Sequence, residues 1–275
     1  MHIKNFYLAF LLLLAVPAIA QRSSGDLDQS GNWLSEHDNG TPGSSTGQLL
    51  FAVPSIAQKS SGYLDQSSNW LWEHDNGTPG SSTGQLTFNV TNPSLDRSAT
   101  QFLVAYSHYG GERFHLLFGS DAAATYFIYD TYVYVVDPKQ VQNLELDVDQ
   151  VTANGETIVY GTQCSSVSGT WEYTYVTGGR GYWKPSNIPC DPRNWAPNRW
   201  HHIQIQMHRV GDVVTHDWVK FDNDRLRFFT NATAPSGLFL NWTPGVLLIN
   251  FQVDGASANS GTIQGYFDRL QTWRR

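Results

Sequence analysis

The sequence predicts an all-β protein, a two-sheet antiparallel jelly-roll sandwich. From Leu86 onward, short segments rich in Val, Ile, Thr and aromatic residues alternate with turn dipeptides such as Asn-Gly, Gly-Gly and Asp-Pro. No segment keeps a 3.6-residue apolar period over the length of a helix. Many strands at this spacing, without helices between them, are typical of a sandwich or barrel rather than an α/β fold.

The expected strands are bounded by turn residues such as Asn154-Gly155, Gly178-Gly179 and Asp191-Pro192. In chain order, these strands are 86–90, 101–106, 113–118, 125–136, 143–148, 157–162, 169–176, 201–209, 213–221, 225–229, 246–253 and 261–273.

Composition narrows the class of protein. The chain has 275 residues, with 24 acidic and 17 basic side chains and a formal net charge of −7. An acidic balance argues against a sequence-independent nucleic-acid binder, which needs a basic surface. A charged fraction of 15% with an aromatic fraction of 13% argues against both disorder and a coiled coil.

Residues 1–20 have the features of a signal peptide. An apolar run from Phe6 to Val16 follows the polar start, and Ala18-Ile19-Ala20 supplies the small residues of a cleavage site. The run is shorter than the roughly 20 residues that cross a bilayer, and no later segment is long and apolar enough. The sequence therefore predicts a secreted protein, extracellular or periplasmic, without a membrane span.

Secretion permits a disulfide. Cys164 and Cys190 are the two cysteines of the chain, so they are expected to pair. They lack the close CxxC spacing of most metal-binding or reactive thiol pairs, which is the alternative interpretation.

Residues 15–51 recur as 52–88, and six of the 37 positions differ: 18, 22, 26, 31, 35 and 50. The copied unit includes the end of the signal peptide, which indicates a duplication rather than a solenoid. We expect 21–58 to be a surplus, poorly ordered Gly/Ser-rich segment and 59–275 to form the jelly roll. Tyr63 and Trp72 are Asp26 and Ser35 in the first copy, which suggests two lost aromatic core anchors. In the alternative, both copies pair with the body as functional arms.

The carboxylates of Glu145, Asp147 and Asp149 are the sharpest chemical signal. Alternate residues of a strand share a face, so these three should line one side while Leu144, Leu146 and Val148 enter the core. Two carboxyls about 5–5.5 Å apart are what a retaining glycosidase needs. Acids that hold sugar hydroxyls, or a solvated sheet face, are the alternatives.

Three stretches resemble the concanavalin A-like lectin/glucanase superfamily, the jelly-roll group of laminarinase-type glucanases and laminin-G-like modules. They are 143–150 (NLELDVDQ), 199–206 (RWHHIQIQ), and the ending 249–255 (INFQVDG) with 261–270 (GTIQGYFDRL). The chain as a whole is similar to secreted bacterial members of this superfamily. The resemblance implies the sandwich fold and a site for glycans.

Laminarinase-type glucanases carry Glu-x-Asp-x-Glu, or Glu-x-Asp-x-x-Glu with a bulge. The resemblance therefore implies Glu145 as nucleophile and Asp147 as orienting acid. The acid/base position falls on Asp149 without a bulge and on Gln150 with one. Gln has no titratable proton and Asp is one methylene shorter than Glu, so the motif is degraded.

Aromatic residues should form the stacking walls of a sugar groove. Tyr132 and Tyr134 share one parity on a strand, and Trp171 and Trp183 flank a Gly-Gly-Arg-Gly turn inside the expected disulfide loop. Trp183 is expected on a loop. Core packing is the alternative for each of them.

No metal site is expected from the histidines. His201 and His202 would point to opposite faces of a strand, and His37 and His74 lack zinc-site spacing. Asp268, in the Tyr-Phe-Asp of the closing strand, is similar to an acidic residue that holds structural calcium in some carbohydrate-binding jelly rolls. The resemblance thus allows a calcium near Asp268, and no other cofactor is implied.

Three functions remain open. The leading hypothesis is a secreted carbohydrate-binding module that holds a polysaccharide or other glycan in a sheet groove without turnover. Glu145, Asp147, Asp149 and Gln150 would form its polar floor, with Tyr132, Tyr134, Trp171 and Trp183 as walls. The second is a laminarinase-like retaining glycoside hydrolase that uses Glu145, Asp147 and Asp149. The third is a structural protein of the cell envelope or matrix.

Overall fold

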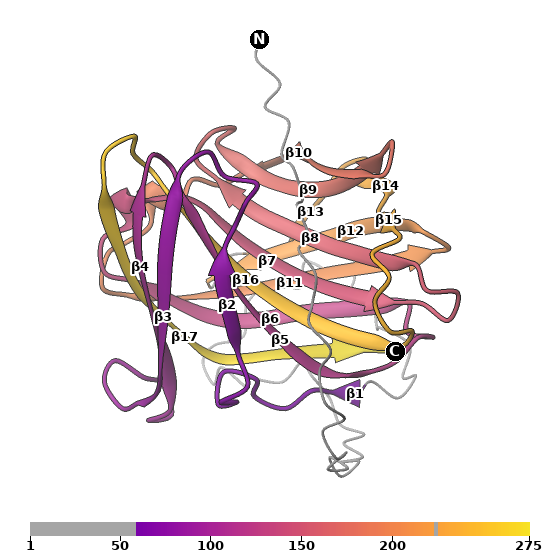
Figure 1. The fold of residues 1–275 in the computed structure, drawn as a ribbon, viewed down its shortest axis with the longest axis horizontal. Helices are drawn as coiled ribbons and strands as arrows, with labels where there is room; N and C mark the ends of the chain where they lie inside the picture. Colours follow the sequence, from indigo (N-terminus) through magenta and orange to yellow (C-terminus); the bar gives the residue numbers. More distant parts are fainter. Residues whose placement is uncertain (1–58, 223–224) are drawn as a thin grey trace, which may run out of the picture.

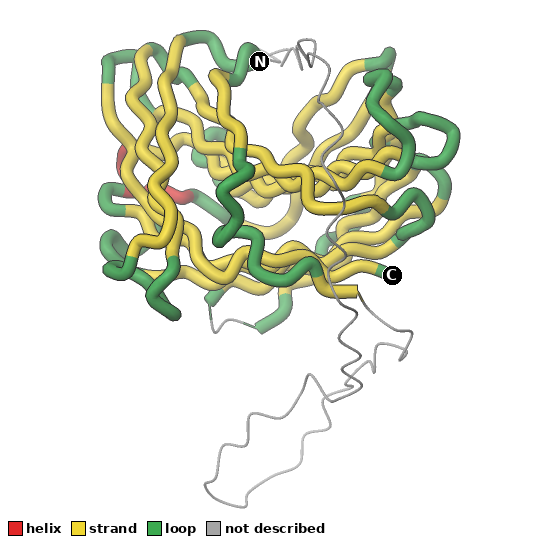
Figure 2. The backbone as a smooth tube through the Cα atoms, turned by 60° about the horizontal axis from the view of Figure 1, so that its bottom comes forward, coloured by secondary structure: helices red, strands yellow, loops and turns green. Residues whose placement is uncertain are grey.

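The computed structural model describes residues 59–222 and 225–275. The signal peptide expected at 1–20 and the duplicated segment expected at 21–58 lie outside the described residues. The regular secondary structure of the described chain is almost all strand, with two short helical turns at one side of the view in Figure 2. Two antiparallel sheets form a sandwich, so the predicted all-β jelly-roll fold is confirmed.

The first sheet has nine strands in the order β13-β12-β11-β6-β17-β4-β3, with β1 paired to β17 and β14 paired to β12 (Figure 1). Its strands are β1 (Lys59–Ser60), β3 (Ser81–Val90), β4 (Ala99–Ser107), β6 (Tyr126–Val135), β11 (Trp200–Val210), β12 (Val213–Phe221), β13 (Arg227–Phe228), β14 (Thr233–Pro235) and β17 (Gly261–Arg274).

The second sheet has eight strands in the order β10-β9-β8-β7-β16-β5-β2, with β15 paired to β8. Its strands are β2 (Leu71–His74), β5 (Gly111–Ser120), β7 (Val141–Val151), β8 (Thr157–Ser165), β9 (Thr170–Thr177), β10 (Arg180–Pro189), β15 (Gly237–Leu238) and β16 (Val246–Gly255). The helical turns are η1 (Pro138–Gln140) and η2 (Pro192–Asn194).

The core lies between the sheets and is built by period-2 alternation. Leu144, Leu146 and Val148 of β7 are fully buried in it, as their parity predicts. Phe251 of β16 packs against Phe102 and Phe267 of the other sheet, with ring centroids 5.1 Å apart in both pairs. The opposite parity of the eight-stranded sheet therefore carries the polar side chains outward.

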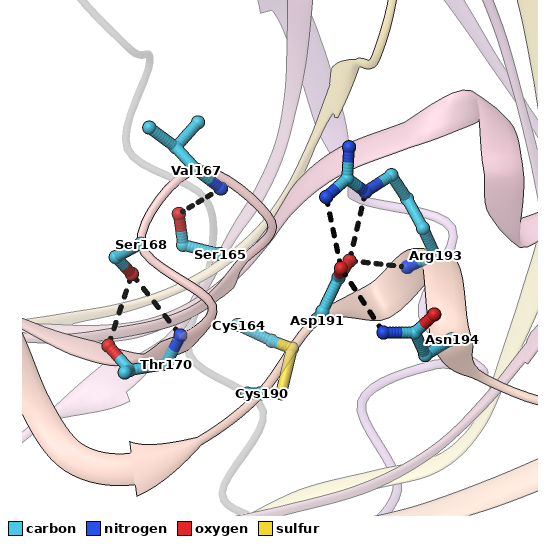
Figure 3. Close-up of a disulfide and its surroundings, with 9 residues drawn as sticks. All are labelled: Cys164, Ser165, Val167, Ser168, Thr170, Cys190, Asp191, Arg193 and Asn194. Atoms are coloured by element: carbon cyan, nitrogen blue, oxygen red, sulfur yellow. Dashed lines mark hydrogen bonds and ion pairs between the residues drawn. A yellow bond between two sulfur atoms is a disulfide. The ribbon is translucent and has the colours of Figure 1, made fainter.

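The Cys164–Cys190 disulfide is confirmed (Figure 3). It links β8 to the segment that follows β10. Beside it, the Asp191 carboxylate accepts hydrogen bonds from the backbone N–H and the guanidinium of Arg193, which fixes the start of η2. The disulfide thus ties one end of the eight-stranded sheet to the helical turn that leads into β11.

The second copy of the repeat supplies β1, β2 and most of β3, and those of its differences from the first copy that lie within the described residues fall on exposed positions. Tyr63 and Trp72 keep 47% and 41% of their surface exposed, so the expectation that they are core anchors is wrong. The other differing residues that the structure describes, Lys59, Ser68 and Thr87, are exposed as well. Leu64 and Trp70, which are buried, are the same in both copies.

Within the described ranges, no helix has the length and apolar character needed to cross a membrane.

Candidate functional site

The outer face of the eight-stranded sheet holds a pocket. Its lining runs from Glu73 on β2, across β5, β16, β7, β8 and β9, to Trp183 on β10, and includes Trp242 from the segment before β16. Glu145, Asp147 and Asp149 all line it. Neighbouring strands lie about 4.8 Å apart, so the six spacings from β2 to β10 make the lining about 29 Å wide.

Strand register aligns polar side chains in a row across this sheet. Glu145 lies opposite Gln252 of β16 on one side and opposite Gln163 of β8 on the other. The row continues to Arg113 and Glu73 in one direction and to Glu172 in the other. Arg113 donates to Glu73, and Gln163 donates to Glu172.

Asp147 lies in the next row and receives the most hydrogen bonds of the three acids. It accepts hydrogen bonds from Thr162 N at 3.2 Å and from Asn250 Nδ2 at 3.2 Å. Burial raises its pKa, while these donors and a hydrogen bond with Glu145 oppose the rise. Asn250 Nδ2 also donates to Glu145 Oε1 at 3.3 Å.

Glu145 is a buried carboxyl beside Asp147, and both accept from the same amide of Asn250. Burial and then the charge of Asp147 raise the pKa of Glu145 well above its usual range. The pKa of Glu145 is raised further than that of Asp147, which favours the protonated form of Glu145 in this pair. A protonated Glu145 can donate or accept a hydrogen bond, but it is a poor nucleophile.

Asp149 differs from both. Its side chain is 7% exposed, and its Oδ1 has no hydrogen-bond partner within the described structure. Burial, followed by the charge of Asp147, raises its pKa well above the usual range. No bulge interrupts the pairing of β7 with β8 from Asn143 to Val151, so Glu145, Asp147 and Asp149 alternate regularly on one face of β7.

Two basic residues, Arg113 and His115, line the pocket. The Glu73 carboxylate and neighbouring acids hold the pKa of Arg113 above its usual value against the effect of burial. Burial, with a contribution from Arg113, lowers the pKa of His115 to about 4, so its ring is neutral near pH 7. Arg113 is thus the charged base in the lining.

Aromatic side chains form one wall. Trp183 and Tyr182 line the pocket from β10, and Trp242 lines it from the segment after β15. Trp183 lies opposite Thr174 of β9 and belongs to a strand rather than to the loop that was expected. The Gly178-Gly179 turn, with φ of 59° and 71°, closes the β9–β10 hairpin that carries it.

Four of the expected binding residues lie elsewhere. Trp171 is 2% exposed and packs in the core between the sheets. Gln150 points away from the pocket and donates to the carbonyls of Asp121 and Ala124. Tyr132 and Tyr134 belong to β6 of the other sheet, where Tyr132 stacks on His202 with centroids 4.1 Å apart.

Asn250 and Gln252 are pocket residues that the sequence analysis did not name. The sequence analysis singled out their stretch, 249–255, only because it resembles the superfamily. In 249–255, Ile249, Phe251 and Val253 are buried in the core, while Asn250 and Gln252 line the pocket. This is the same alternation that identified the carboxylates of β7. Arg113, His115 and Trp242 have no comparable local signal, because long-range strand pairing brings them to the site.

The histidines of β11 lie on opposite faces, as expected. His201 Nδ1 contacts Asp222 Oδ2 at 2.9 Å, and His202 Nε2 contacts Asp130 Oδ1 at 2.7 Å. Among residues 59–222 and 225–275, no three His, Cys, Asp or Glu side chains are grouped to hold a metal ion.

Asp268 has part of what a calcium site needs. Its Oδ2 accepts from Ser94 Oγ and Leu95 N, and its Oδ1 has no partner in the described structure. Asp65, whose pKa is raised to about 7 by burial and by the nearby Asp268, likewise keeps Oδ2 without a partner. Calcium takes six to eight oxygens, and these two carboxylates do not complete such a shell.

Comparisons with known proteins give likenesses among solved structures alone. No protein-family model matches the sequence, and no curated protein matches it. Among solved structures, the chain is similar to a carbohydrate-binding module of the β-sandwich superfamily, with TM-score 0.40 and 11% identity over 76% of this chain and 59% of that one. It is also similar to the β-glucanase of Bacillus licheniformis, with TM-score 0.39 and 13% identity over 80% and 99% of the two chains.

A third similar structure is the family 11 carbohydrate-binding module of Clostridium thermocellum, in complex with a β-1,3-1,4-mixed-linked tetrasaccharide. Its TM-score is 0.34, and it is 13% identical over 78% of this chain and 94% of that one. The strand pairings described above establish the fold independently of these likenesses.

Proposed function

We propose that this protein binds a polysaccharide chain in the pocket of the eight-stranded sheet, without turning it over. The observation that carries the proposal is the row of carboxyl and amide side chains centred on Glu145, flanked by the aromatic wall of Trp183, Tyr182 and Trp242. Carboxylates and amides bind sugar hydroxyls, and aromatic rings pack against the C–H faces of sugars.

The ligand is elongated. The lining crosses about 29 Å of sheet, at right angles to the strands, which is more than a single sugar ring can contact. Asp149 Oδ1, Asn250 Oδ1 and His115 Nδ1 are buried side-chain atoms without a partner in the described structure, and all three residues line the pocket. Such atoms cost stability unless a ligand or water satisfies them. Export through the N-terminal signal is part of the proposal, and the disulfide is compatible with it.

Depletion of the full-length protein from solution by a panel of insoluble polysaccharides tests this. Trp183→Ala removes one ring of the aromatic wall. Trp200 is a half-buried tryptophan on the other sheet, and Trp200→Ala is the matched control. We expect at least one polysaccharide to retain the wild type and Trp200→Ala. Trp183→Ala should bind at least about fivefold more weakly, as for a residue worth over 1 kcal/mol. Failure of every polysaccharide to retain the protein, or equal retention of Trp183→Ala, would contradict the proposal.

Hydrolysis is the second candidate, and Asp149 is the observation in its favour. A buried carboxyl with a raised pKa suits a general acid. Against it, burial and Asp147 raise the pKa of Glu145, which disfavours the carboxylate that a nucleophile needs. Glu145 and Asp149 are also four residues apart on a regular strand, about 13 Å between Cα atoms. The two carboxyls would have to lean together to reach the 5–5.5 Å of a retaining enzyme.

Release of reducing ends from any polysaccharide that retains the protein separates the two functions. Binding without release supports the proposed module. Release that disappears in both Glu145→Gln and Asp149→Asn would establish the hydrolase instead.

A further inference from the structure

The pocket has an unbalanced charge. Five carboxyl groups line it, those of Glu73, Asp75, Glu145, Asp147 and Asp149, against the single guanidinium of Arg113. Arg113 is already paired with Glu73. The neighbours that act on the Glu145 carboxyl are mainly other acids, Asp147, Asp254 and Asp75. Arg113 is therefore the one fixed positive charge in the lining, and burial raises the pKa of Glu145 and Asp149 without a basic partner of their own to oppose it.

Asp149 is the point where compensation is most clearly missing. Asp147 receives hydrogen bonds from Thr162 N and Asn250 Nδ2, whereas Asp149 Oδ1, in a side chain that is 93% buried, receives none in the described structure. A buried carboxyl without a donor is costly, and a cation or a donor from a ligand would relieve that cost. Its neighbours in the row, Leu248 and Val159, are apolar and cannot supply one.

A metal ion does not fit this arrangement. The acids of the lining come from β2, the segment after it and three alternate positions of β7, and no three of them are grouped to hold one ion. Positive charges spaced along a chain can meet acids that are spread over a surface. The aromatic wall of Trp183, Tyr182 and Trp242 suits a ligand that carries both a ring face and a cation, because aromatic faces attract ammonium groups.

We propose that the pocket is selective for a polysaccharide of amino sugars, with a protonated amino group of one sugar placed at Asp149. This inference rests on the proposed function and names its substrate class. The same charge imbalance repels uronic-acid and sulfated polysaccharides, since like charges brought together at a binding interface cost several kcal/mol.

The test compares binding of three soluble oligosaccharides with the same β-1,4 linkage and length, made of glucosamine, N-acetylglucosamine and glucose. Calorimetric titrations of the full-length protein are run at pH 6, where a primary amine is charged, at low and at high salt. We expect the glucosamine oligomer to bind at least about tenfold more tightly than the glucose oligomer. The ratio should shrink at high salt, where exposed charge interactions are screened.

Asp149→Asn keeps the shape of the side chain and removes the carboxyl that would ionise beside the amino group of the ligand. We expect this variant to lower the ratio of glucosamine to glucose affinity by at least about threefold. Asp212→Asn makes the same substitution on the exposed turn between β11 and β12, and should leave the ratio unchanged. Thermal unfolding of each variant confirms that it is folded.

The outcomes separate the two proposals. Equal affinity for the glucosamine and glucose oligomers, or a ratio unchanged by Asp149→Asn, overturns the amino-sugar selectivity while leaving a neutral-glycan site intact. Binding of spermine as tight as that of the glucosamine oligomer also overturns it, because a simple polyamine would then suffice. Failure of every oligomer to bind, together with failure of the polysaccharide panel, overturns the proposed function itself.

Discussion

Asn250 lies opposite Asp147 in the pairing of β16 with β7, and its Nδ2 donates to Asp147 Oδ2 at 3.2 Å. The same nitrogen donates to Glu145 Oε1 at 3.3 Å. One amide thus donates to both acids of the buried pair. The geometry of the pocket floor depends on it.

Asn250→Asp should therefore destabilise the protein in a pH-dependent way. The change replaces the shared donor with a third carboxyl, and we expect a loss of about 1–3 kcal/mol in unfolding free energy at pH 7 relative to wild type. At pH 4 the added carboxyl is largely protonated and the loss should be smaller. Urea unfolding of both proteins at the two pH values measures it. An equal loss at both pH values would show that repulsion is not its cause.

Gly161→Ala should destabilise the protein by crowding Asp147 and Thr174 from β8. Gly161 lies opposite Asp147 on β8, and a Cβ there would lie 2.4 Å from Thr174 Cγ2 and 3.0 Å from Asp147 Oδ1. We expect a loss of about 1–3 kcal/mol by denaturant unfolding. Thr174→Ser removes the clashing methyl group and should recover part of that loss in the double variant. Additive effects of the two substitutions would contradict this assignment.

Asp65 should make stability fall as the pH rises. Burial raises its folded-state pKa to about 7, above the value near 3.8 of an exposed Asp. The unfolded chain loses the proton first, so the contribution of Asp65 is full below about pH 4 and is lost as the pH rises to about 7. Asp65→Asn keeps the acceptor for Leu270 N and removes this dependence.

The stability of Asp65→Asn relative to wild type should thus increase from pH 4 to pH 7, by about 2–4 kcal/mol. The comparison cancels the opposite trend of His115 and His216, whose burial lowers each pKa to about 4 and favours the folded state at higher pH. Thermal unfolding across this range measures the difference. A constant difference would mean that Asp65 is ionised in the folded protein.

The two copies of the repeat should be interchangeable where the structure describes them. Lys59→Arg, Tyr63→Asp, Ser68→Gly, Trp72→Ser and Thr87→Leu convert the second copy to the sequence of the first at exposed positions. Surface changes of this kind usually stay within about 0.5 kcal/mol each. Trp70→Ala, at a fully packed position that both copies share, should instead cost about 3–5 kcal/mol. A large loss from any one of the five exchanges would contradict the equivalence.

The disulfide and the floor of the site could be predicted from the sequence, for local reasons. Period-2 alternation places Glu145, Asp147 and Asp149 on one face whatever the topology. The same alternation cannot say which sheet a strand joins, which is why Tyr132 and Tyr134 were grouped with the acids although β6 belongs to the opposite sheet. Local sequence does not place Trp171 either, because aromatic residues occur both in cores and in binding sites.

The rest of the site depends on pairings between distant parts of the chain. Arg113 reaches Glu145 only through β16, which lies more than a hundred residues further along the chain and pairs with both strands. Trp242 enters from an irregular segment without a sequence pattern. No local feature of the sequence encodes such juxtapositions, so the walls of the pocket were found only in the structure.

The most direct test of polysaccharide binding in this pocket is an NMR titration of the tryptophan indole N–H signals, assigned by single substitutions. An oligosaccharide of whichever polysaccharide retains the protein is added to the full-length chain. We predict that the signals of Trp183 and Trp242, which line the pocket, shift on binding. The signals of Trp171 in the core and Trp200 on the other sheet should stay in place. Shifts confined to Trp200, with Trp183 and Trp242 unaffected, would place the ligand on the opposite face and contradict the account.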